Sequence, residues 1–446
     1  MSSPSRGPLA LTTLALAVLV GCAAAPPAAA PSPPSSPASS LASAPVSVPP
    51  STRPIPPPSS SPAAPAAAEG ATTSERFARW VADFRATARQ AGVDEATLRS
   101  ALDEVRYLPQ VVEADRAQPE LLKTVWDYLD RAVTPSRVAL GQKKLGEVRA
   151  LAEAAATRYG VPASILVAIW GMESDYGANY GNIPIPDALA TLGFEGRRED
   201  WARGQLLAAL KILQSGDIDR ARMVGSWAGA MGQTQFLPSV FLAHAVDGDG
   251  DGRRDLWGSM ADVLPSTANF LRHSGWQAGQ RWGTEVRLPA GFDHGRAQSE
   301  VRQSSTQWAA EGLQAMDGAA LPAFPDAEIL LPAGARGPAF LIGSNFRAIL
   351  RYNNSNSYAL GVSLLAQGID RGPGVQARWP RELPALTRQQ VLALQTALNQ
   401  RGFDAGAVDG LLGPATSAGL RRFQRTIGLP ADGYPVPELL QRLQVP

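Results

Sequence analysis

From about Ser74 onward, apolar positions along the chain recur mostly at helical spacing. Phe77, Trp80, Val81 and Phe84 follow one another at intervals of one or three residues with charged residues between them, which is typical of an amphipathic helix. The same spacing predicts further helices over residues 119–132, 135–159, 163–175, 201–214, 260–273, 344–351 and 358–367. The pattern therefore predicts a mainly α region.

Two stretches depart from the helical pattern. Between about residues 282 and 343, short alternating runs such as 284–288 and 339–342 stand among many Gly and Pro residues, which predicts a small β-rich insertion and an α+β class. Gly and Pro concentrate again over 372–384, which indicates a boundary. Beyond it, 385–446 carries its own amphipathic stretches and is predicted to be a separate helical unit.

The N-terminus has a different pattern. Arg6 precedes an apolar run over 9–20 that is too short to span a bilayer comfortably and has the layout of a signal peptide. The run ends in Leu-Val-Gly-Cys at 19–22, which resembles a bacterial lipobox, so 1–22 is predicted to be a lipoprotein signal peptide with Cys22 as the lipidation site. A plain signal peptide with a chance cysteine is the alternative.

Residues 23–70 are almost entirely Ala, Pro and Ser. Such a segment buries too little apolar surface to offset its ordering entropy, so a disordered linker is predicted, either as a tether or as low-complexity filler. The residue after the cysteine is Ala23, whereas some lipoproteins have Asp there. In Gram-negative lipoproteins this resembles the pattern for sorting to the outer membrane. Together with the lipobox, this predicts a cell-envelope protein anchored to the membrane by lipid, facing the periplasm.

Length and charge narrow the classes further. A chain of 446 residues predicts two or three domains. Its 41 basic and 40 acidic residues give a formal net charge of +1 without a basic stripe, so no nucleic-acid partner is expected. The single cysteine excludes an intramolecular disulfide.

A carboxylate with the position of a catalytic acid lies in the predicted helix 163–175. Pro162 suits the first turn of this helix and Gly177 suits its end. Glu173 shares a helix face with Ile169 and Trp170, so it lies on the apolar stripe. Apolar surroundings raise the pKa of a carboxyl group, as a general acid requires near neutral pH. The alternative is a structural glutamate satisfied by an arginine or by backbone donors.

Two later segments have the composition of a sugar-binding cleft. Residues 225–239 combine small residues, which allow a ligand to approach, with uncharged hydrogen-bonding side chains. Residues 351–359 are rich in Tyr and Asn. Amides, hydroxyls and aromatic faces are the groups that bind sugars, although each segment alone could consist of turns and helix caps.

Together these motifs, with 128–138 and 159–162, strongly resemble the membrane-bound lytic transglycosylase B family of peptidoglycan-cleaving enzymes over about 77–370. The resemblance implies a lysozyme-like helical catalytic domain over 71–375. It also implies that Glu173 is the catalytic glutamate. The implied substrate-binding residues are Tyr128, Ser226, Gln235, Tyr352, Asn353 and Tyr358.

The implied reaction needs one carboxyl group, whereas ordinary glycoside hydrolysis uses two. Glu173 would protonate the β-1,4 oxygen between N-acetylmuramic acid and N-acetylglucosamine, then accept the proton of the muramoyl C6 hydroxyl as a 1,6-anhydro ring closes. Asp175 is no second carboxylate, because positions two apart face different sides of a helix. The resemblance therefore implies a carbon–oxygen lyase that acts on a polysaccharide in cell-wall turnover. The alternatives are a hydrolytic muramidase and a non-catalytic wall-binding tether.

A calcium loop is predicted over residues 247–255. Aspartates stand at the first, third and fifth positions of an EF-hand pattern, followed by Gly252 at the sixth. Gly258 stands where the pattern has a bidentate Glu, and Asp262 matches the ligand used after the longer loop of the resembled family. The predicted ligands of a structural Ca²⁺ are Asp247, Asp249, Asp251, the Arg253 carbonyl and Asp262. The alternative is that the loop is a solvated acidic turn without an ion. For the cleavage reaction itself, no cofactor is expected.

The C-terminal unit resembles the small peptidoglycan-binding module of many cell-wall enzymes. The pairs Asp409-Gly410 and Asp432-Gly433 are turn signals, and Leu and Phe occupy core positions between them. The resemblance implies a three-helix domain over 385–446. The expected partners are therefore peptidoglycan glycan strands and, through the lipid anchor, the membrane; which protein partners bind the enzyme does not follow from the sequence.

Overall fold

The computed structural model describes residues 71–117, 123–297 and 301–444. The predicted signal peptide, Cys22 and the 23–70 linker lie outside these residues. In the described ranges, no helix combines the length and apolar character needed to cross a bilayer.

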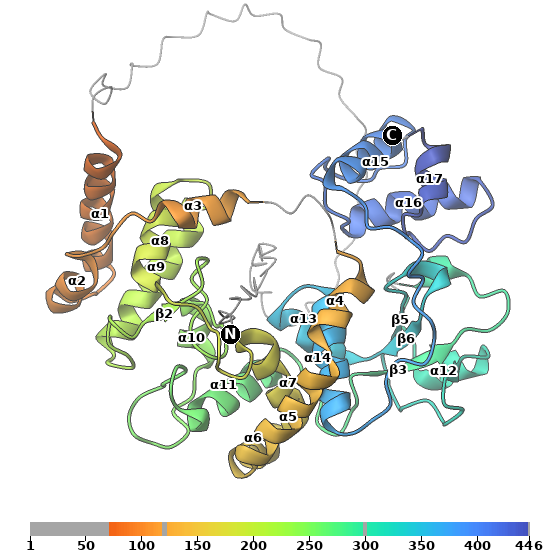
Figure 1. Ribbon diagram of the computed structural model, residues 1–446, viewed down its shortest axis with the longest axis horizontal. Helices are drawn as coiled ribbons and strands as arrows, with labels where there is room; N and C mark the ends of the chain where they lie inside the picture. The colour runs from red at the N-terminus through yellow and green to blue at the C-terminus, as the bar shows by residue number, and fades with distance from the viewer. Residues whose placement is uncertain (1–70, 118–122, 298–300, 445–446) are drawn as a thin grey trace, which may run out of the picture.

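The described chain is mainly helical, which confirms the predicted fold class (Figure 1). An N-terminal lobe contains α1 (Thr73–Gln90), α2 (Glu95–Leu102), α3 (Pro109–Arg116), α8 (Ile185–Phe194), α9 (Glu199–Gln214) and α10 (Pro238–His244). A central bundle contains α4 (Val125–Ala132), α5 (Pro135–Glu147), α6 (Arg149–Tyr159), α7 (Ala163–Ser174), α11 (Met260–His273), α13 (Ser344–Tyr352) and α14 (Asn356–Ile369). The C-terminal module contains α15 (Arg388–Gln400), α16 (Pro414–Thr426) and α17 (Pro437–Arg442).

Two small antiparallel sheets complete the architecture. Strands β1 (Ile183–Pro184) and β2 (Val224–Gly225) pair in the N-terminal lobe. The predicted β-rich insertion forms a second sheet in the order β4-β3-β6-β5. Its strands are β3 (Gly283–Arg287), β4 (Gln314–Ala315), β5 (Glu328–Leu330) and β6 (Ala339–Ile342). The insertion also holds helix α12 (Ser305–Ala310) and the 3₁₀ turns η1 (His294–Arg296) and η2 (Gly334–Arg336).

The first helix shows how the sequence pattern becomes packing. Thr72 and Glu75 form a capping box that satisfies backbone donors at the start of α1. Phe77 and Phe84 are buried, and Trp80 stacks on Phe84 with ring centroids 5.5 Å apart. The apolar stripe predicted from their spacing therefore fixes α1 on the N-terminal lobe.

The central bundle surrounds α7, which packs against α5, α6, α11 and α14. The predicted helix 135–159 is wrong in one respect, because it is two helices that meet at Val148. Val148 has φ −107° and ψ 16°, outside helical geometry, and its side chain packs against the core. Of the predicted helix 119–132, only α4 is a described helix.

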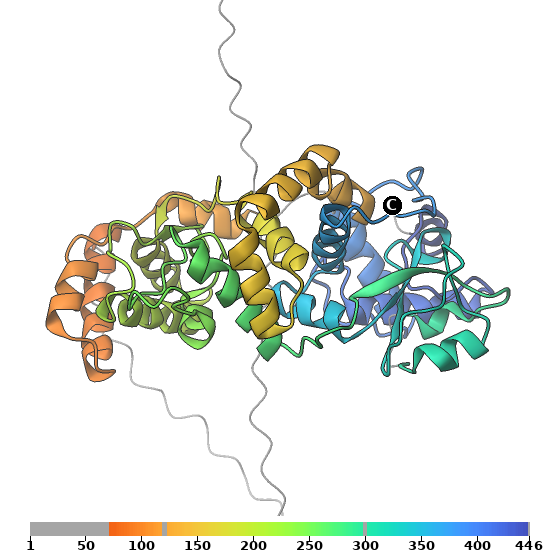
Figure 2. The same cartoon turned by 90° about the horizontal axis from the view of Figure 1, so that it is seen from below.

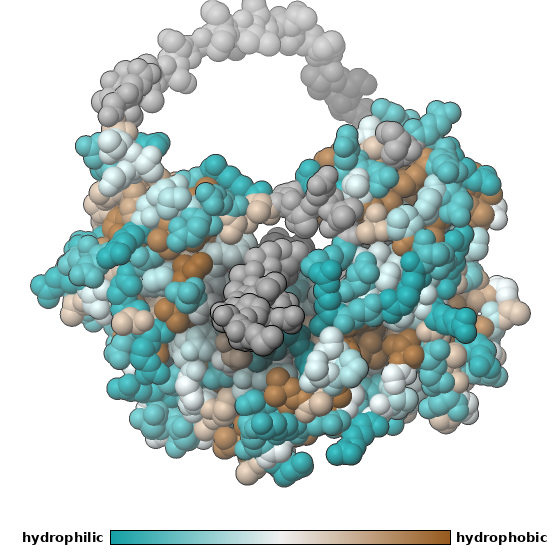
Figure 3. Space-filling model, viewed as in Figure 1, coloured by the Kyte–Doolittle hydropathy of each residue, from teal (hydrophilic) through white to brown (hydrophobic). Residues whose placement is uncertain are grey.

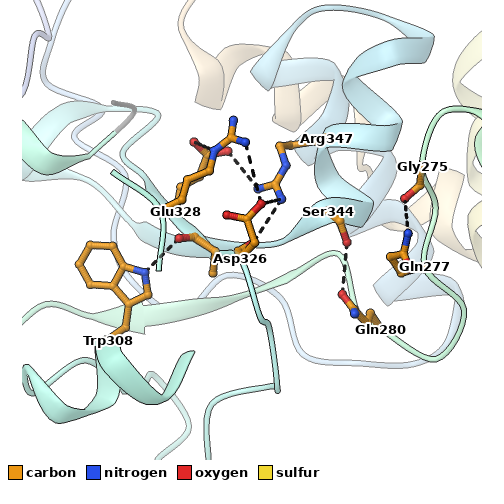
Figure 4. Close-up of polar contacts among 10 residues, drawn as sticks. Gly275, Gln277, Gln280, Trp308, Asp326, Glu328, Ser344 and Arg347 are labelled. Carbon is orange, nitrogen blue, oxygen red and sulfur yellow. Dashed lines mark hydrogen bonds and ion pairs between the residues drawn. The ribbon is translucent and has the colours of Figure 1, made fainter. Parts of the chain in front are cut away.

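The insertion braces the start of α13 (Figure 4). Arg347 of α13 donates to Asp326 Oδ2 at 2.6 Å and lies 3.5 Å from Glu328 Oε1 on β5. Ser344 Oγ, one turn earlier, donates to Gln280 Oε1 at 3.2 Å. These contacts hold α13 against the sheet, and the far end of α13 carries Tyr352.

The C-terminal module lies beside the insertion (Figures 1 and 2). Its core forms around Leu394, Leu398 and Leu420, all without exposed surface. The buried Gln395 side chain ties its helices to the turn at Asp409 with a 2.8 Å hydrogen bond. Asp432 accepts the backbone N–H of Ala335 in the insertion at 2.8 Å, so the module is docked on the catalytic part.

The segment that joins the catalytic part to the C-terminal module also makes several polar contacts with the catalytic part. Both carboxylate oxygens of Glu285 accept backbone N–H groups, from Gln376 and Ala377, each at 2.7 Å. Arg381 makes a two-pronged ion pair with Asp130 of α4 at 2.6 and 2.9 Å. The visible surface around these parts is predominantly hydrophilic, with small scattered apolar patches (Figure 3).

Candidate active site

Helix α7 presents Glu173 in its last turn. Leu166 and Ile169 on the same face have no exposed surface, and Trp170 is nearly buried, as the apolar stripe predicts. The helix ends at Ser174, three residues before the predicted stop at Gly177. Packing of this face against the bundle holds the Glu173 carboxyl group at the edge of the core.

The turn that follows Glu173 has an unusual backbone. Asp175, Tyr176 and Gly177 have successive φ values of 51°, 58° and 83°, in the left-handed region that residues other than Gly rarely adopt. Ser174 Oγ stabilises the turn by donating to Trp170 O and accepting the N–H of Gly177, each at 3.1 Å. The backbone beside the carboxyl group is therefore closely constrained.

The surroundings of Glu173 favour its protonated form. The side chain is half-buried, and Tyr358 Oη donates to Glu173 Oε1 at 2.5 Å. Burial raises the pKa of Glu173 to about 7, although the Tyr358 hydrogen bond acts in the lowering direction. Within the described residues Glu173 takes part in no ion pair. The group can therefore hold and release a proton near neutral pH.

Three tyrosines surround this carboxyl group. Burial, followed by the negative charge of Glu173, raises the pKa values of Tyr128, Tyr352 and Tyr358, so each stays a neutral phenol. Tyr352 Oη donates to the carbonyl of Thr234 at 2.7 Å. The structure thus brings Tyr128, Tyr352 and Tyr358 together around Glu173 and connects Tyr352 to the 225–239 loop.

The other predicted cleft residues are used mainly to shape that loop. Ser226 Oγ accepts the N–H of Ala230 at 3.1 Å. Gln235 has φ 51° and donates to the carbonyls of Tyr180 and Gly232 at 3.0 and 2.9 Å. Neither has a hydrogen bond to Glu173 among the described contacts.

Asn353 differs from these residues. Its Oδ1 atom is buried and has no hydrogen-bond partner within the described chain. An unsatisfied buried acceptor is costly in a folded protein, so it points to a donor supplied from outside the chain.

Asp175, the other carboxylate near the end of α7, has a different environment from Glu173. Its side chain is exposed and forms a 3.2 Å ion pair with Arg137.

Gln233 was not predicted from the sequence, yet its buried side chain accepts a 2.7 Å hydrogen bond from Trp170 Nε1, one turn before Glu173. A glutamine in a loop of small polar residues normally faces solvent, so its spacing carries no signal for this contact.

The acidic loop lies between α10 and α11. Ligand oxygens of Asp247, Asp249 and Asp251 lie within 4.8 Å of one another. Asp262 is separate from this cluster: its two oxygens accept the N–H groups of Gly248 and Asp255, at 2.8 and 2.7 Å, and so close the two ends of the loop. Converging carboxylate oxygens are a donor set that suits a hard cation such as Ca²⁺.

Comparisons with known proteins identify two families along the chain. The transglycosylase SLT domain family matches residues 76–367, and a peptidoglycan binding domain family matches 387–443. The chain is 34% identical over 294 residues to the membrane-bound lytic murein transglycosylase B of Escherichia coli (strain K12), covering 62% of this chain and 79% of that protein.

Two solved structures are also similar. SltB3 from Pseudomonas aeruginosa, in complex with NAG-anhNAM-pentapeptide, is 51% identical with a TM-score of 0.80, covering 82% of this chain and 99% of that one. The Escherichia coli lytic transglycosylase Slt35, in complex with calcium, is 31% identical with a TM-score of 0.55, covering 66% of this chain and 93% of that one.

Proposed function

The chain belongs to the transglycosylase SLT domain family, and from this premise we propose that Glu173 is its single catalytic acid and base. Membership confirms the predicted family, the lysozyme-like helical fold and the activity. The protein is a peptidoglycan lytic transglycosylase with a C-terminal peptidoglycan-binding domain, and it acts in the cell envelope.

The observation that carries the role of Glu173 is its position: its carboxyl group lies in the last turn of α7 at the edge of the core, where Tyr358 donates to it, and burial there raises its pKa to about 7. As an acid, Glu173 donates its proton to the glycosidic oxygen while the bond from that oxygen to muramoyl C1 breaks. As a carboxylate, it then takes the proton of the C6 hydroxyl while the C6 oxygen bonds to C1. The proton returns to Glu173, no water is consumed and the product has a 1,6-anhydro end.

The six cleft residues are proposed to bind the glycan: Tyr128, Ser226, Gln235, Tyr352, Asn353 and Tyr358. The unsatisfied Oδ1 of Asn353 supports this role, since each N-acetyl sugar carries an amide N–H that it can accept. The ligands named for the SltB3 complexes, NAG-anhNAM-pentapeptide and NAG-NAM-pentapeptide, are also consistent with a cleft for an amino-sugar strand.

Replacement of Glu173 by Gln tests the proposal. Gln keeps the shape but cannot donate a proton of the required acidity, so release of anhydro-muropeptides from purified sacculi should fall by roughly 10²- to 10⁴-fold. Mass spectrometry of the products measures this loss. Asp175→Asn is the matched control, because Asp175 is exposed and should leave the products unchanged. Near-normal activity of Glu173→Gln would assign the chemistry to another residue.

The acidic loop is proposed to hold a structural Ca²⁺ through Asp247, Asp249, Asp251 and the Arg253 carbonyl, with Asp262 completing or closing the site. The calcium named for Slt35 supports this proposal. At a hundredfold excess over its dissociation constant, the ion would add about 2.7 kcal/mol of stability. Asp251→Ala should therefore make the melting temperature insensitive to EDTA, while Asp255→Asn, outside the cluster, should retain the response. Equal melting curves for the unmutated protein with calcium and with EDTA would contradict the proposal.

The remaining organisation is proposed from the sequence. Residues 1–22 are the signal peptide, lipid on Cys22 anchors the protein, and 23–70 tether a catalytic domain over 71–375 and a wall-binding domain over 385–446. The anchor would hold the enzyme at the outer membrane, facing the periplasm. Cys22→Ala should release an active soluble protein, as membrane fractionation would detect; retention in washed membranes would contradict lipid anchoring.

A further inference from the structure

Gln233 lies between the catalytic helix α7 and residues 256–257, which directly follow the acidic loop. Its side chain is nearly buried, and both ends of its amide are used: Oε1 accepts Trp170 Nε1 at 2.7 Å, and Nε2 donates to the carbonyl of Trp257 at 2.8 Å. Its backbone N–H donates to the carbonyl of Leu256 at 2.8 Å. One residue thus contacts both segments.

At the catalytic end, Gln233 reaches both sides of Glu173. Trp170 lies one helical turn before Glu173, so its indole ring and the carboxyl group share a face of α7. After Glu173, the left-handed turn brings Gly177 against the amide: a β-carbon at this position would collide with Gln233 Oε1. Gln233 therefore restrains the last turn of α7 and the backbone that follows it.

At the other end, the contacts of Gln233 lie directly after the acidic loop. Leu256 and Trp257 follow Asp255, whose N–H is held by Asp262 Oδ2 at 2.7 Å. Trp257 Nε1 donates to the carbonyl of Val224 at 2.8 Å, in the strand that leads to Ser226. A change in the path of the loop would move the two carbonyls that hold Gln233.

We infer that Gln233 is a positioning residue that transmits the conformation of the acidic loop to Glu173. This inference rests on the proposed roles of Glu173 and of the loop as a cation site. Gln233 touches neither substrate nor the reacting atoms in this scheme. Gln233 determines the position of the Glu173 carboxyl group, and cation binding in the acidic loop determines the position of Gln233.

Gln233→Leu in the full-length protein tests the positioning role. The change leaves Trp170 Nε1 and the Trp257 carbonyl unpaired, so kcat should fall by roughly ten- to a hundredfold through misplacement of Glu173, with little change in KM. The alkaline limb of the pH–rate profile should also shift. Gln205→Leu is the matched control, because Gln205 is equally buried and bonded at both ends to Ser239, at 2.9 and 3.0 Å, away from α7.

The control should lose stability without a change in kcat or pH profile. Equal kinetic losses in both variants, with unshifted profiles, would overturn the positioning role. Trp170→Phe removes the same hydrogen bond from the other side and should reproduce the kinetic effect. It replaces Gln233→Leu if that variant does not fold.

The link to the loop is tested by NMR of ¹⁵N-tryptophan-labelled protein, with the Trp170 indole signal assigned through Trp170→Phe. Calcium should shift this signal in the unmutated protein and much less in Gln233→Leu, while calorimetry finds calcium bound to both. Binding without a shift would overturn the transmission. Absence of binding to the unmutated protein would instead refute the cation site and with it the link, whereas the kinetic test of Gln233 would stand by itself.

Discussion

Glu173 and Asp217 are two carboxylates whose environments can be compared directly, one in the last turn of α7 and one in the loop after α9. Asp217 is buried, and burial alone would raise its pKa. Arg254, with hydrogen bonds at 2.9 and 2.6 Å, and Ser215 outweigh burial and lower the pKa of Asp217. Among the described residues, Glu173 accepts a side-chain hydrogen bond only from the hydroxyl of Tyr358, and burial has the larger effect on its pKa.

The difference shows what separates a structural carboxylate from a reactive one. A charged donor keeps Asp217 ionised and makes it a fixed link between the 215–222 loop and the exit of the acidic loop. A neutral donor orients Glu173 without stabilising its charge enough to keep it ionised. The choice of donor therefore decides whether a buried carboxyl group can exchange a proton near neutral pH.

The largest effect is expected when the ion pair between Asp217 and Arg254 is broken. Asp217→Asn leaves Arg254 without its ion partner and should lower the free energy of unfolding by about 3 kcal/mol at pH 7. Because the folded pKa of Asp217 is lowered, its contribution is present above the unfolded value near 3.8 and is lost as the pH falls through the folded value. Urea denaturation at several pH values measures this. Exposed Asp219→Asn is the control and should change stability by less than about 0.5 kcal/mol.

The opposite change in stability is expected for the unpaired carboxylate. The folded pKa of Glu173 is about 7 against an ordinary 4.5, so the unfolded chain loses its proton first and stability falls as the pH rises from 4.5 to 7. Glu173→Gln removes this decline and should be about 3 kcal/mol more stable than the unmutated protein at pH 8, with no difference at pH 4. A variant less stable at both pH values would show that Glu173 is a structural group.

The smallest effect is expected when the neutral donor to Glu173, the hydroxyl group of Tyr358, is removed. Tyr358→Phe removes the hydrogen bond that acts to lower the pKa of Glu173, so the alkaline limb of the pH–rate profile should move upward from about 7. We expect kcat to fall by about tenfold, the loss of roughly one hydrogen bond to a charged group. Tyr107→Phe is a matched control, since Tyr107 donates to Glu195 at the same 2.5 Å distance in the N-terminal lobe. An equal shift in both variants would remove the special role of Tyr358.

The sequence predicted most of the fold where one face of an element is buried. Helix α11 has the predicted bounds, because its apolar positions follow the helical period. Strand β6 also has the predicted bounds, although all four of its residues are buried, because Gly and Pro residues delimit its short apolar run. Helix α8 was not predicted: nearly all of its residues are buried, so it has no polar face to give a helical period. The break at Val148 depends on packing against the core, which the continuous helical pattern of 135–159 does not reveal.

The site was predictable to a different degree. The apolar neighbours of Glu173 follow from helical spacing alone, while the nearby tyrosines were predicted only through the family resemblance. Gln233 could not be predicted, since its partners lie 63 and 24 positions away and no local pattern links them. Whether the predicted cleft residues contact the glycan remains a prediction of the proposed function.

The segment between the catalytic part and the C-terminal module has a consequence for proteolysis. Proteases cut chains that can detach from a surface and enter their active sites, and such cuts concentrate in exposed loop tips and weakly held connections. Here Glu285 holds the backbone at Gln376 and Ala377, and Arg381 is fastened to Asp130. A protease should therefore spare this Gly- and Pro-containing connection, and fragments from a brief digestion should keep the two parts on one polypeptide.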